Sequence, residues 1–475
     1  MMRRRLNSPV SMVILTCLLL AHAGPQGWAQ DTRTQQHIKV GTTVPVSGDR
    51  PTTPHIEPHV AVHPANPDHL VGAAVTVMDS TVISLFVSVD GGQSWSRTLF
   101  PRCWLDPWIT FGADDTVFFA CLENKDRVAV LVYRSADGGR TWNEPTEVPF
   151  ETGAWAGTPA IREVSGYDHE SMVFDRTEGP YQGTLYMVAF QAVRMANEAF
   201  FASPVFLKST DAGRSFAPPV RIIASNVWAN TMNPVVFSDG SVGFAFYDFA
   251  VDLGDSMRPL RTKRISWVRS DDGGRSFTVP YLVAETTETS TLPLLAVDPS
   301  EGPFQDRLYL AVDDVRAGKA GVYLFFSEDE GEQWSEAVRI TDVEHPDPIF
   351  ANPAVTVGTD GVVGVAWYDG RHATDGACWD LYFSASLDGG ETFLPNVRVS
   401  EETACSNVPG NVVERGGGER FDVARRWPSG GDYFGLVVLP GGAFQLLWAD
   451  SRTGVYQLWT ARIDVRDEAS SDPLR

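Results

Sequence analysis

The chain contains 475 residues, of which 21% are charged and 43% hydrophobic, a composition typical of a globular rather than a disordered protein. Its formal net charge of -22 argues against a nucleic-acid-binding protein, because no broad basic surface is available to neutralise phosphates, although a local basic pocket stays possible. The length exceeds that of a usual single core. It therefore indicates either two or three domains or one repeat architecture in which each unit packs on the next.

The N-terminal residues 1–29 have the features of an export signal. Three arginines at positions 3 to 5 precede the mostly apolar stretch 10–20, and small residues follow as far as Ala29. The apolar stretch is too short to span a bilayer, and no later segment offers about 18 apolar residues in a row. We therefore expect a cleaved signal peptide, a secreted or periplasmic protein and no stable membrane anchor.

Four cysteines remain once this signal is removed, and an even number in an exported protein predicts two disulfides. Four cysteines allow three pairings, of which we favour the two local ones, Cys103–Cys121 and Cys378–Cys405. A metal site is the competing interpretation, but the sequence has no CxxC spacing and no histidines clustered near these cysteines. We expect no metal and no other cofactor.

An eight-residue pattern, S-x-D-x-G-x-[ST]-[WF], recurs along the chain. It begins at residues 88, 135, 209, 270, 327 and 386, and Gln333 is its one departure from the Ser or Thr position. The copies lie about 60 residues apart, a period that suits a unit of four strands. A strand-like run such as ISLFVSVD precedes each copy, a shorter one follows it, and two more lie upstream. Each unit is therefore predicted to be a four-stranded antiparallel blade of a β-propeller.

A seventh unit lacks the eight-residue pattern. Residues 432–465 contain three strand-like runs, and HIKVGTTVPV at residues 37–46 resembles the missing fourth strand. Closing the ring with strands from both ends of the chain would remove exposed sheet edges. We therefore predict that residues 30–466 form one all-β propeller of seven blades, with six blades as the alternative, and that residues 467–475 are a disordered tail.

The aspartate of the eight-residue pattern is predicted to hold a turn. Its carboxylate can accept hydrogen bonds from backbone N–H groups, glycine supplies backbone angles that other residues avoid, and the final Trp or Phe packs into the sheets. Six aspartates spread around a ring could not share one catalytic site. The residues assigned this structural role are Asp90, Asp137, Asp211, Asp272, Asp329 and Asp388.

This repeat resembles the Asp-box (BNR) repeat of the sialidase-like β-propellers, over nearly the whole mature chain. The resemblance implies a glycan substrate or ligand, a pocket on the face away from the Asp boxes, and a glycoside hydrolase as the first candidate. Asp boxes also occur in non-catalytic receptors, so a propeller that only binds a glycan or a protein is the alternative. Sialidases share an arginine triad whose first member sits in an F/Y-R-I-P motif, but the first inner strand here, HIEPHVAV, has Glu57 and no arginine.

The ends of the second strands carry a fainter repeat of acidic and basic residues. AWYDGR contains Asp369 and Arg371, and LWADSR contains Asp450 and Arg452. Near a ring axis, arginine can hold a sugar carboxylate through two parallel hydrogen bonds, and a carboxylic acid can protonate a leaving oxygen. The alternative is that these Asp-x-Arg pairs are ion pairs between blades that stabilise the ring.

Position within the predicted blades assigns two sets of candidate residues. The catalytic candidates are Asp369, Asp450, Asp432 and Tyr433. The substrate-binding candidates are Arg371, Arg452, Arg316, Arg194, Asp248, Asp106 and Glu57. The arginine-rich stretch 411–435 is either an anion-binding loop or a solvated crossover. A lone histidine at a strand entry, such as His169, is more often structural than a general base.

Overall fold

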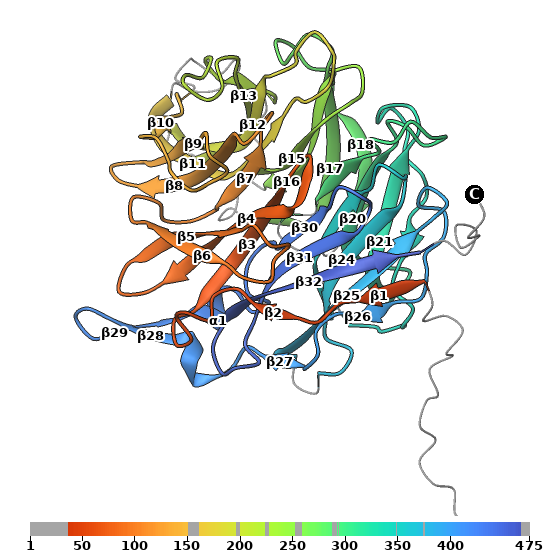
Figure 1. Cartoon of the computed structure of the whole chain (residues 1–475). Coiled ribbons are helices and arrows are strands. Elements are labelled where there is room, and N and C mark those ends of the chain that lie inside the picture. The colour runs from red at the N-terminus through yellow and green to blue at the C-terminus, as the bar shows by residue number, and fades with distance from the viewer. Residues whose placement is uncertain are drawn as a thin grey trace, which may run out of the picture.

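The computed structural model describes residues 37–150, 161–195, 200–223, 228–251, 259–286, 292, 294–347, 349–373 and 376–466. The predicted signal peptide and C-terminal tail lie outside these residues. Within them the protein is all-β, as the repeat predicts, and its strands form antiparallel sheets of four that follow one another along the chain (Figure 1). No helix in these ranges combines the length and the apolar composition that a membrane crossing requires.

The first three sheets correspond to the first three predicted units. Sheet 1 contains β3 (His55–His63), β4 (Asn66–Val77), β5 (Thr81–Ser88) and β6 (Ser96–Phe100). Sheet 2 contains β7 (Trp108–Phe111), β8 (Val117–Asn124), β9 (Val128–Ser135) and β10 (Thr146–Glu147). Sheet 3 contains β11 (Ile161–Phe174), β12 (Leu185–Met195), β13 (Phe200–Ser209) and β14 (Val220–Arg221).

The next three sheets repeat the same order of strands. Sheet 4 contains β15 (Trp228–Val236), β16 (Val242–Val251), β17 (Pro259–Ser270) and β18 (Tyr281–Thr286). Sheet 5 contains β19 (Leu295–Val297), β20 (Leu308–Arg316), β21 (Lys319–Ser327) and β22 (Val338–Arg339). Sheet 6 contains β23 (Phe350–Val357), β24 (Val363–Asp369), β25 (Cys378–Ser386) and β26 (Val397–Arg398). Single parallel bridges join β9 to β11 and β13 to β15.

The last sheet combines both ends of the described chain. It contains β30 (Gly435–Val438), β31 (Phe444–Asp450) and β32 (Gln457–Val465), and its outer strand comes from β1 (Ile38–Val40) and β2 (Val44–Pro45). Ile38 pairs with Val465, and Val44 pairs with Thr460. Figure 1 shows β1, in red, beside the blue β32. The fourth strand that the sequence predicts for this unit is therefore present.

The segment between sheet 6 and the last sheet forms small elements of its own. These are β27 (Ala404–Cys405), the 3₁₀ turn Pro409–Asn411, β28 (Val412–Arg415), β29 (Glu419–Asp422) and α1 (Val423–Arg426). The β28–β29 hairpin projects from the body of the molecule (Figure 1). Both predicted disulfides, Cys103–Cys121 and Cys378–Cys405, are present, and the second ties β27 to β25. Two disulfides are compatible with an extracellular location.

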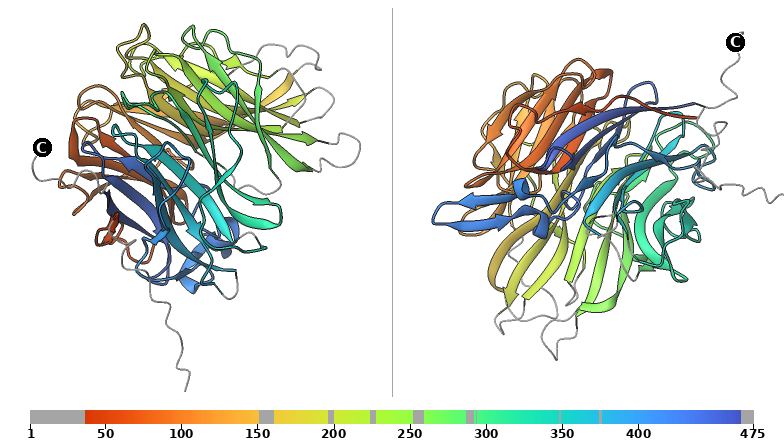
Figure 2. Two further views of the ribbon diagram at one scale, coloured as in Figure 1. Left: turned by 90° about the vertical axis from the view of Figure 1, so that its right-hand side faces the viewer. Right: turned by 90° about the horizontal axis from the view of Figure 1, so that it is seen from below.

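Hydrophobic side chains fill the space between successive sheets, which pack face against face (Figure 2). Two tryptophans at the same place in second strands, Trp367 and Trp448, are fully buried, and so is Trp267 in the third strand β17. One cluster joins the first, second and last sheets and includes Phe86, Phe119 and Leu447. Because every sheet presents apolar side chains on both faces, each sheet needs a neighbour on either side.

The turn after the third strand of sheet 1 shows how an Asp box works. The Asp90 carboxylate accepts hydrogen bonds from the backbone N–H groups of Gln93 and Ser94 and from the Ser94 hydroxyl. These bonds, led by that of the Ser94 hydroxyl, lower the pKa of Asp90 to about 2. Trp95 donates its indole N–H to the Gly92 carbonyl. The residue four positions on likewise donates its backbone N–H and its hydroxyl to Asp137, Asp211, Asp272 and Asp388. At Asp329 the backbone N–H and side-chain amide of Gln333 donate instead, so all six carboxylates are occupied in turns.

Candidate active site

A cavity of about 470 Å³ opens where the innermost strands of the first three sheets and the last sheet begin. Its wall combines ionisable side chains with aromatic rings. The ionisable residues are Glu57, Asp106, Asp168, His169, Arg426 and Asp432, and the aromatic residues are Trp104, Tyr167, Phe190, Phe421 and Trp427. Concave surfaces that pair apolar walls with a few convergent polar groups are the usual form of a small-ligand site.

Unusual backbone geometry places three of these side chains in the wall. Glu57, Asp106 and His169 have φ angles of 50°, 52° and 52°, in the left-handed region that residues other than glycine rarely occupy. The β3 and β11 registers shift at the same places, so β-bulges turn the side chains toward the cavity. Such strain costs about 1–3 kcal/mol per residue and tends to occur at functional sites.

Asp106, Asp168 and His169 form the most compact ionisable group in the cavity. One ligand atom from each lies within 4.8 Å of the other two. The His169 backbone N–H donates to Asp106 at 3.0 Å and to Asp168 at 3.1 Å. Burial, followed by the charge of Asp168, raises the pKa of Asp106 to about 7. Burial acts to lower the pKa of His169, but the carboxylates of Asp168 and Asp106 outweigh it and raise that pKa.

Glu57 and Asp432 are neighbouring carboxylates in different surroundings. Glu57 is 2% exposed, and its Oε2 atom has no hydrogen-bond partner among the described residues. Burial, then the charges of Asp106 and Asp432, raise the pKa of Glu57 well above its usual range. Asp432 lies 3.7 Å from the Arg426 guanidinium. One site therefore holds a carboxyl group biased toward its acid form and another beside a cation.

Three aromatic rings pack beneath these groups. His59 stacks on Trp108 with ring centroids 3.9 Å apart, and Tyr433 meets both rings edge-on. The Tyr433 hydroxyl donates to the Pro107 carbonyl at 3.1 Å, and the Trp108 indole donates to the Met172 carbonyl at 2.9 Å. These bonds hold the segments that carry Asp106 and Asp432 at fixed positions.

The buried side chain of His55, two residues before Glu57, makes the stability of the fold depend on pH. Burial lowers the pKa of His55 to about 4, below the 6.5 of the unfolded chain. The folded state keeps the His55 ring neutral, whereas the unfolded chain protonates it below pH 6.5. The free energy of unfolding is therefore highest above pH 6.5 and falls by about 3 kcal/mol as pH is lowered from about 6.5 to about 4. In urea unfolding across this pH range, His55→Gln should flatten the slope of the unfolding free energy, whereas His345→Gln at a partly exposed position should not. An unchanged slope for His55→Gln would contradict the assignment.

Comparison with known proteins gives one curated relative. It is a sialidase of Bacteroides fragilis (strain YCH46), 24% identical over 306 residues, and the match covers 60% of this chain and 51% of that protein. The resemblance to sialidase-like propellers is confirmed. The chain spans about half the length of this relative. No protein-family model matches the chain.

Solved structures of glycan-acting proteins also resemble this sialidase-like chain. The Hadza microbial sialidase Hz136 is 16% identical, with a TM-score of 0.47 over 83% of this chain and 74% of that one. The NanB sialidase of Streptococcus pneumoniae is 8% identical, with a TM-score of 0.43 over 91% and 98%. The Penicillium chrysogenum α-L-arabinanase is 13% identical, with a TM-score of 0.41 over 76% and 99%. All three scores are below 0.5, so these likenesses alone establish neither fold nor activity.

The structure divides the residues that the sequence singles out into two groups. Glu57, Asp106 and Asp432 line the cavity, and Tyr433 packs beneath them. The remaining described candidates lie elsewhere, in ion pairs or at the surface: Asp369, Arg371, Asp450, Arg452, Arg316 and Arg194. The side chain of Asp248 lies outside the described residues.

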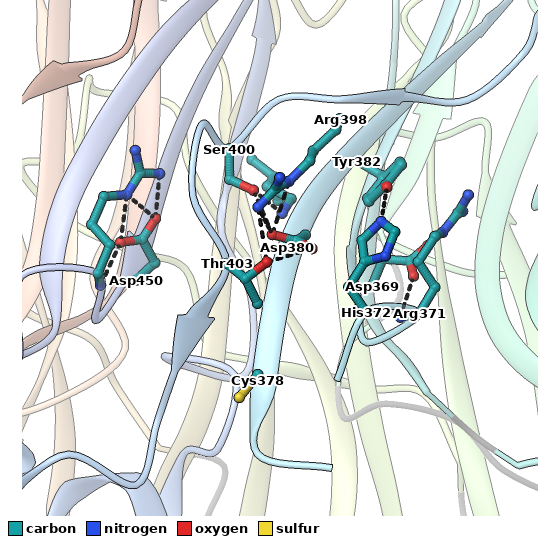
Figure 3. A network of polar contacts seen from close by, with 12 residues as sticks. Asp369, Arg371, His372, Cys378, Asp380, Tyr382, Arg398, Ser400, Thr403 and Asp450 are labelled. Carbon is teal, nitrogen blue, oxygen red and sulfur yellow. Dashed lines mark hydrogen bonds and ion pairs between the residues drawn. The ribbon is translucent and has the colours of Figure 1, made fainter. Parts of the chain in front are cut away.

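The Asp-x-Arg pairs are local ion pairs at the ends of second strands. Asp369 accepts a hydrogen bond from the Trp367 indole at 2.9 Å. It accepts another from the Arg371 guanidinium at 2.7 Å, and Figure 3 labels these two residues. Asp450 repeats this arrangement, accepting from the Trp448 indole and the Arg452 guanidinium. Arg371 also reaches Asp342, which follows the fifth sheet, and so links two sheets. Asp314 and Arg316 form a third such pair at 3.1 Å.

The sequence interpretation missed Asp168 and Glu170 and treated His169 as structural. A usable signal is present nonetheless, since Glu57, Asp106 and Asn352 each come directly before a proline at the start of an inner strand. All three have positive φ angles, and so does His169 in the equivalent place without a proline. The polar residue before proline at the entry of an inner strand would have singled out Glu57 and Asp106, which line the cavity.

Proposed function

We propose that this chain is a glycoside hydrolase whose substrate binds in the 470 Å³ cavity. The observation that carries the proposal is the pairing of Glu57, buried and biased toward its acid form, with Asp432 beside the Arg426 guanidinium. Glycosidases need one carboxylic acid to protonate the leaving oxygen and one carboxylate to attack the anomeric carbon or activate water. Glu57 would supply the proton, and Asp432 would act as the carboxylate.

The charge of the cavity favours a substrate without a carboxylate. Arg426 is the arginine among the described lining residues, and it already faces Asp432. A sialic acid carboxylate would compete with Asp432 for the Arg426 guanidinium and would be repelled by the Asp432 carboxylate. The aromatic walls, including Trp104 and Trp427, offer the flat apolar surfaces on which sugar rings can lie. We therefore propose a neutral or amino sugar as the substrate.

The same proposal includes a closed ring of seven blades, a pocket on the face opposite the Asp boxes, and export of the protein. The inner strands contact one another in a cycle, β3–β7–β11–β15–β19–β23–β30 and back to β3, which supports a closed ring of seven blades. The cavity residues stand at the starts of inner strands, whereas the Asp boxes follow the third strands, which supports a pocket on the opposite face. The basic and apolar N-terminal sequence and the two disulfides support export through a signal peptide at residues 1–29.

A glycoside panel tests the proposed activity and the substrate class together. The full chain is incubated with aryl glycosides of neutral sugars, amino sugars and sialic acid, and release of the aryl group is measured. We expect hydrolysis of at least one neutral or amino glycoside and slower hydrolysis of the sialoside. A faster sialoside reaction would contradict the substrate class. Binding of a glycan without hydrolysis would instead establish the non-catalytic alternative.

A further inference from the structure

The carboxylates of Asp106 and Asp168 and the ring of His169 meet at one point of the cavity wall, with a ligand atom of each within 4.8 Å of the other two. We propose that these three side chains bind a divalent transition-metal ion. Ligand atoms on one such ion lie about 3–4 Å apart, because each bond is about 2.1 Å long. A small rotation of Asp168, whose side chain is 45% exposed, closes the remaining gap.

The Nδ1 atom of His169 has a hydrogen-bond partner, as one ring nitrogen of a metal-ligating histidine usually does. This Nδ1 atom lies 2.8 Å from the amide of Asn230, which also contacts the Tyr247 hydroxyl at 3.2 Å. The Nε2 atom of His169 faces Asp168, 3.9 Å from Oδ1. A partner on one ring nitrogen sets the tautomer and orients the other nitrogen toward the ion.

The amide of Asn230 completes this arrangement after a half turn about its side chain. Its Oδ1 atom has no hydrogen-bond partner among the described residues, while its nitrogen faces His169 and Tyr247. The half turn places the oxygen where it accepts from both the His169 Nδ1–H and the Tyr247 hydroxyl. The lone pair of His169 Nε2 is then available to a metal ion.

Glu170 provides an independent observation that points to a cation. It is 2% exposed, and neither of its carboxylate oxygens has a partner among the described residues. It lines a small void of about 10 Å³ together with Asp106 and His169, a space that fits a single ion or water. An unpaired buried carboxylate is costly, and a divalent cation among these groups would offset that cost.

The donor set selects among the common divalent ions. Carboxylate oxygens alone would suit Mg²⁺ or Ca²⁺, but an imidazole nitrogen among the ligands favours Mn²⁺ or Zn²⁺. Such an ion would present open positions to the cavity, where the hydroxyl groups of a ligand could complete its coordination. The expectation of no metal rests on the cysteines alone, whereas the ligands proposed here come from the segment before β7 and from β11, which are far apart in the sequence.

Calorimetric titration of the full chain, freed of metal with a chelator, tests the site without any need for hydrolysis. The ions titrated are Zn²⁺, Mn²⁺, Mg²⁺ and Ca²⁺. We expect one site per chain, with Zn²⁺ or Mn²⁺ bound more tightly than Mg²⁺ or Ca²⁺. Asp168→Asn should weaken binding by at least about tenfold, since even partners outside the coordination shell contribute about 10–100-fold. His169→Asn, which tolerates the positive φ, should remove the preference for Zn²⁺ and Mn²⁺.

Two controls keep the outcomes distinct. Asp79→Asn, at an exposed position on the β4–β5 turn, should leave metal binding unchanged. Glu57→Gln should bind the ion while losing hydrolysis, so a failure of the metal site and a failure of the proposed activity can be told apart. The proposal is overturned if neither Zn²⁺ nor Mn²⁺ binds, or if Asp168→Asn, folded by circular dichroism, binds them as tightly as the unaltered chain.

Discussion

Replacement of Glu57 by glutamine is expected to lower kcat for glycoside hydrolysis by about 10²–10⁴-fold, the usual contribution of a positioned general acid. Glutamine has the shape of the protonated acid, and Glu57 is held toward that form by burial. The fold should therefore persist, and KM should change little. The measurement is steady-state hydrolysis of the best substrate from the glycoside panel, together with a thermal melt of the variant.

The pH profile separates a catalytic role of Glu57 from a structural one. In the unaltered chain kcat should fall as pH rises through the raised pKa of Glu57, because the proton needed by the leaving oxygen is lost. Glu57→Gln should lack this alkaline limb. Glu301→Gln, the same chemical change at an exposed loop position, should leave both the rate and the profile unchanged. A fully active Glu57→Gln variant would exclude Glu57 as the acid.

Asp432→Asn completes the test of the pair. The change removes the carboxylate that faces Arg426 but keeps its shape. We expect a fall in kcat at all pH values, without the selective loss of one limb that Glu57→Gln produces. Equal rates for Asp432→Asn and the unaltered chain would restrict the proposal to Glu57.

Replacement of Asp369 by alanine is expected to lower the free energy of unfolding by about 3–5 kcal/mol, the usual cost of removing one partner from a buried ion pair. Asp369 is fully buried, and its loss leaves the Trp367 indole without its acceptor and removes one of the two carboxylates that pair with Arg371. Since Arg371 also joins two sheets through Asp342, the damage should reach beyond one blade. Urea unfolding measures the change.

An exposed ion pair in the last sheet supplies the matched control. Arg462 and Asp464 lie 3.1 Å apart, but their side chains are 53% and 39% exposed. Asp464→Ala should therefore change the unfolding free energy by about 0.5 kcal/mol or less. If Asp369→Ala were as stable as Asp464→Ala yet inactive, Asp369 would have to be returned to the catalytic candidates.

Sequence patterns over a few neighbouring residues were sufficient to predict most of the fold. The eight-residue boxes predict each turn because their bonds join atoms no more than four residues apart, as at Ser88, Asp90 and Ser94. Alternating apolar runs predict the strands, and the composition of both chain ends predicts that β1 completes the sheet of β32. The two disulfides join cysteines 18 and 27 residues apart, which is the local pairing that the sequence favours among the three possible ones.

The set of residues that forms the cavity could not be identified from the sequence, because its members are brought together by packing between blades. Asp369 and Glu57 are both buried acids near strand ends, and sequence alone ranked Asp369 higher because an arginine lies two residues away. That same arginine neutralises Asp369 within its own blade, whereas Glu57, Asp106 and Asp168 come from separate blades and share a cavity. Burial and distance between segments far apart in the chain determine charge, pKa and access, so the site could be located only once the sheets were placed side by side.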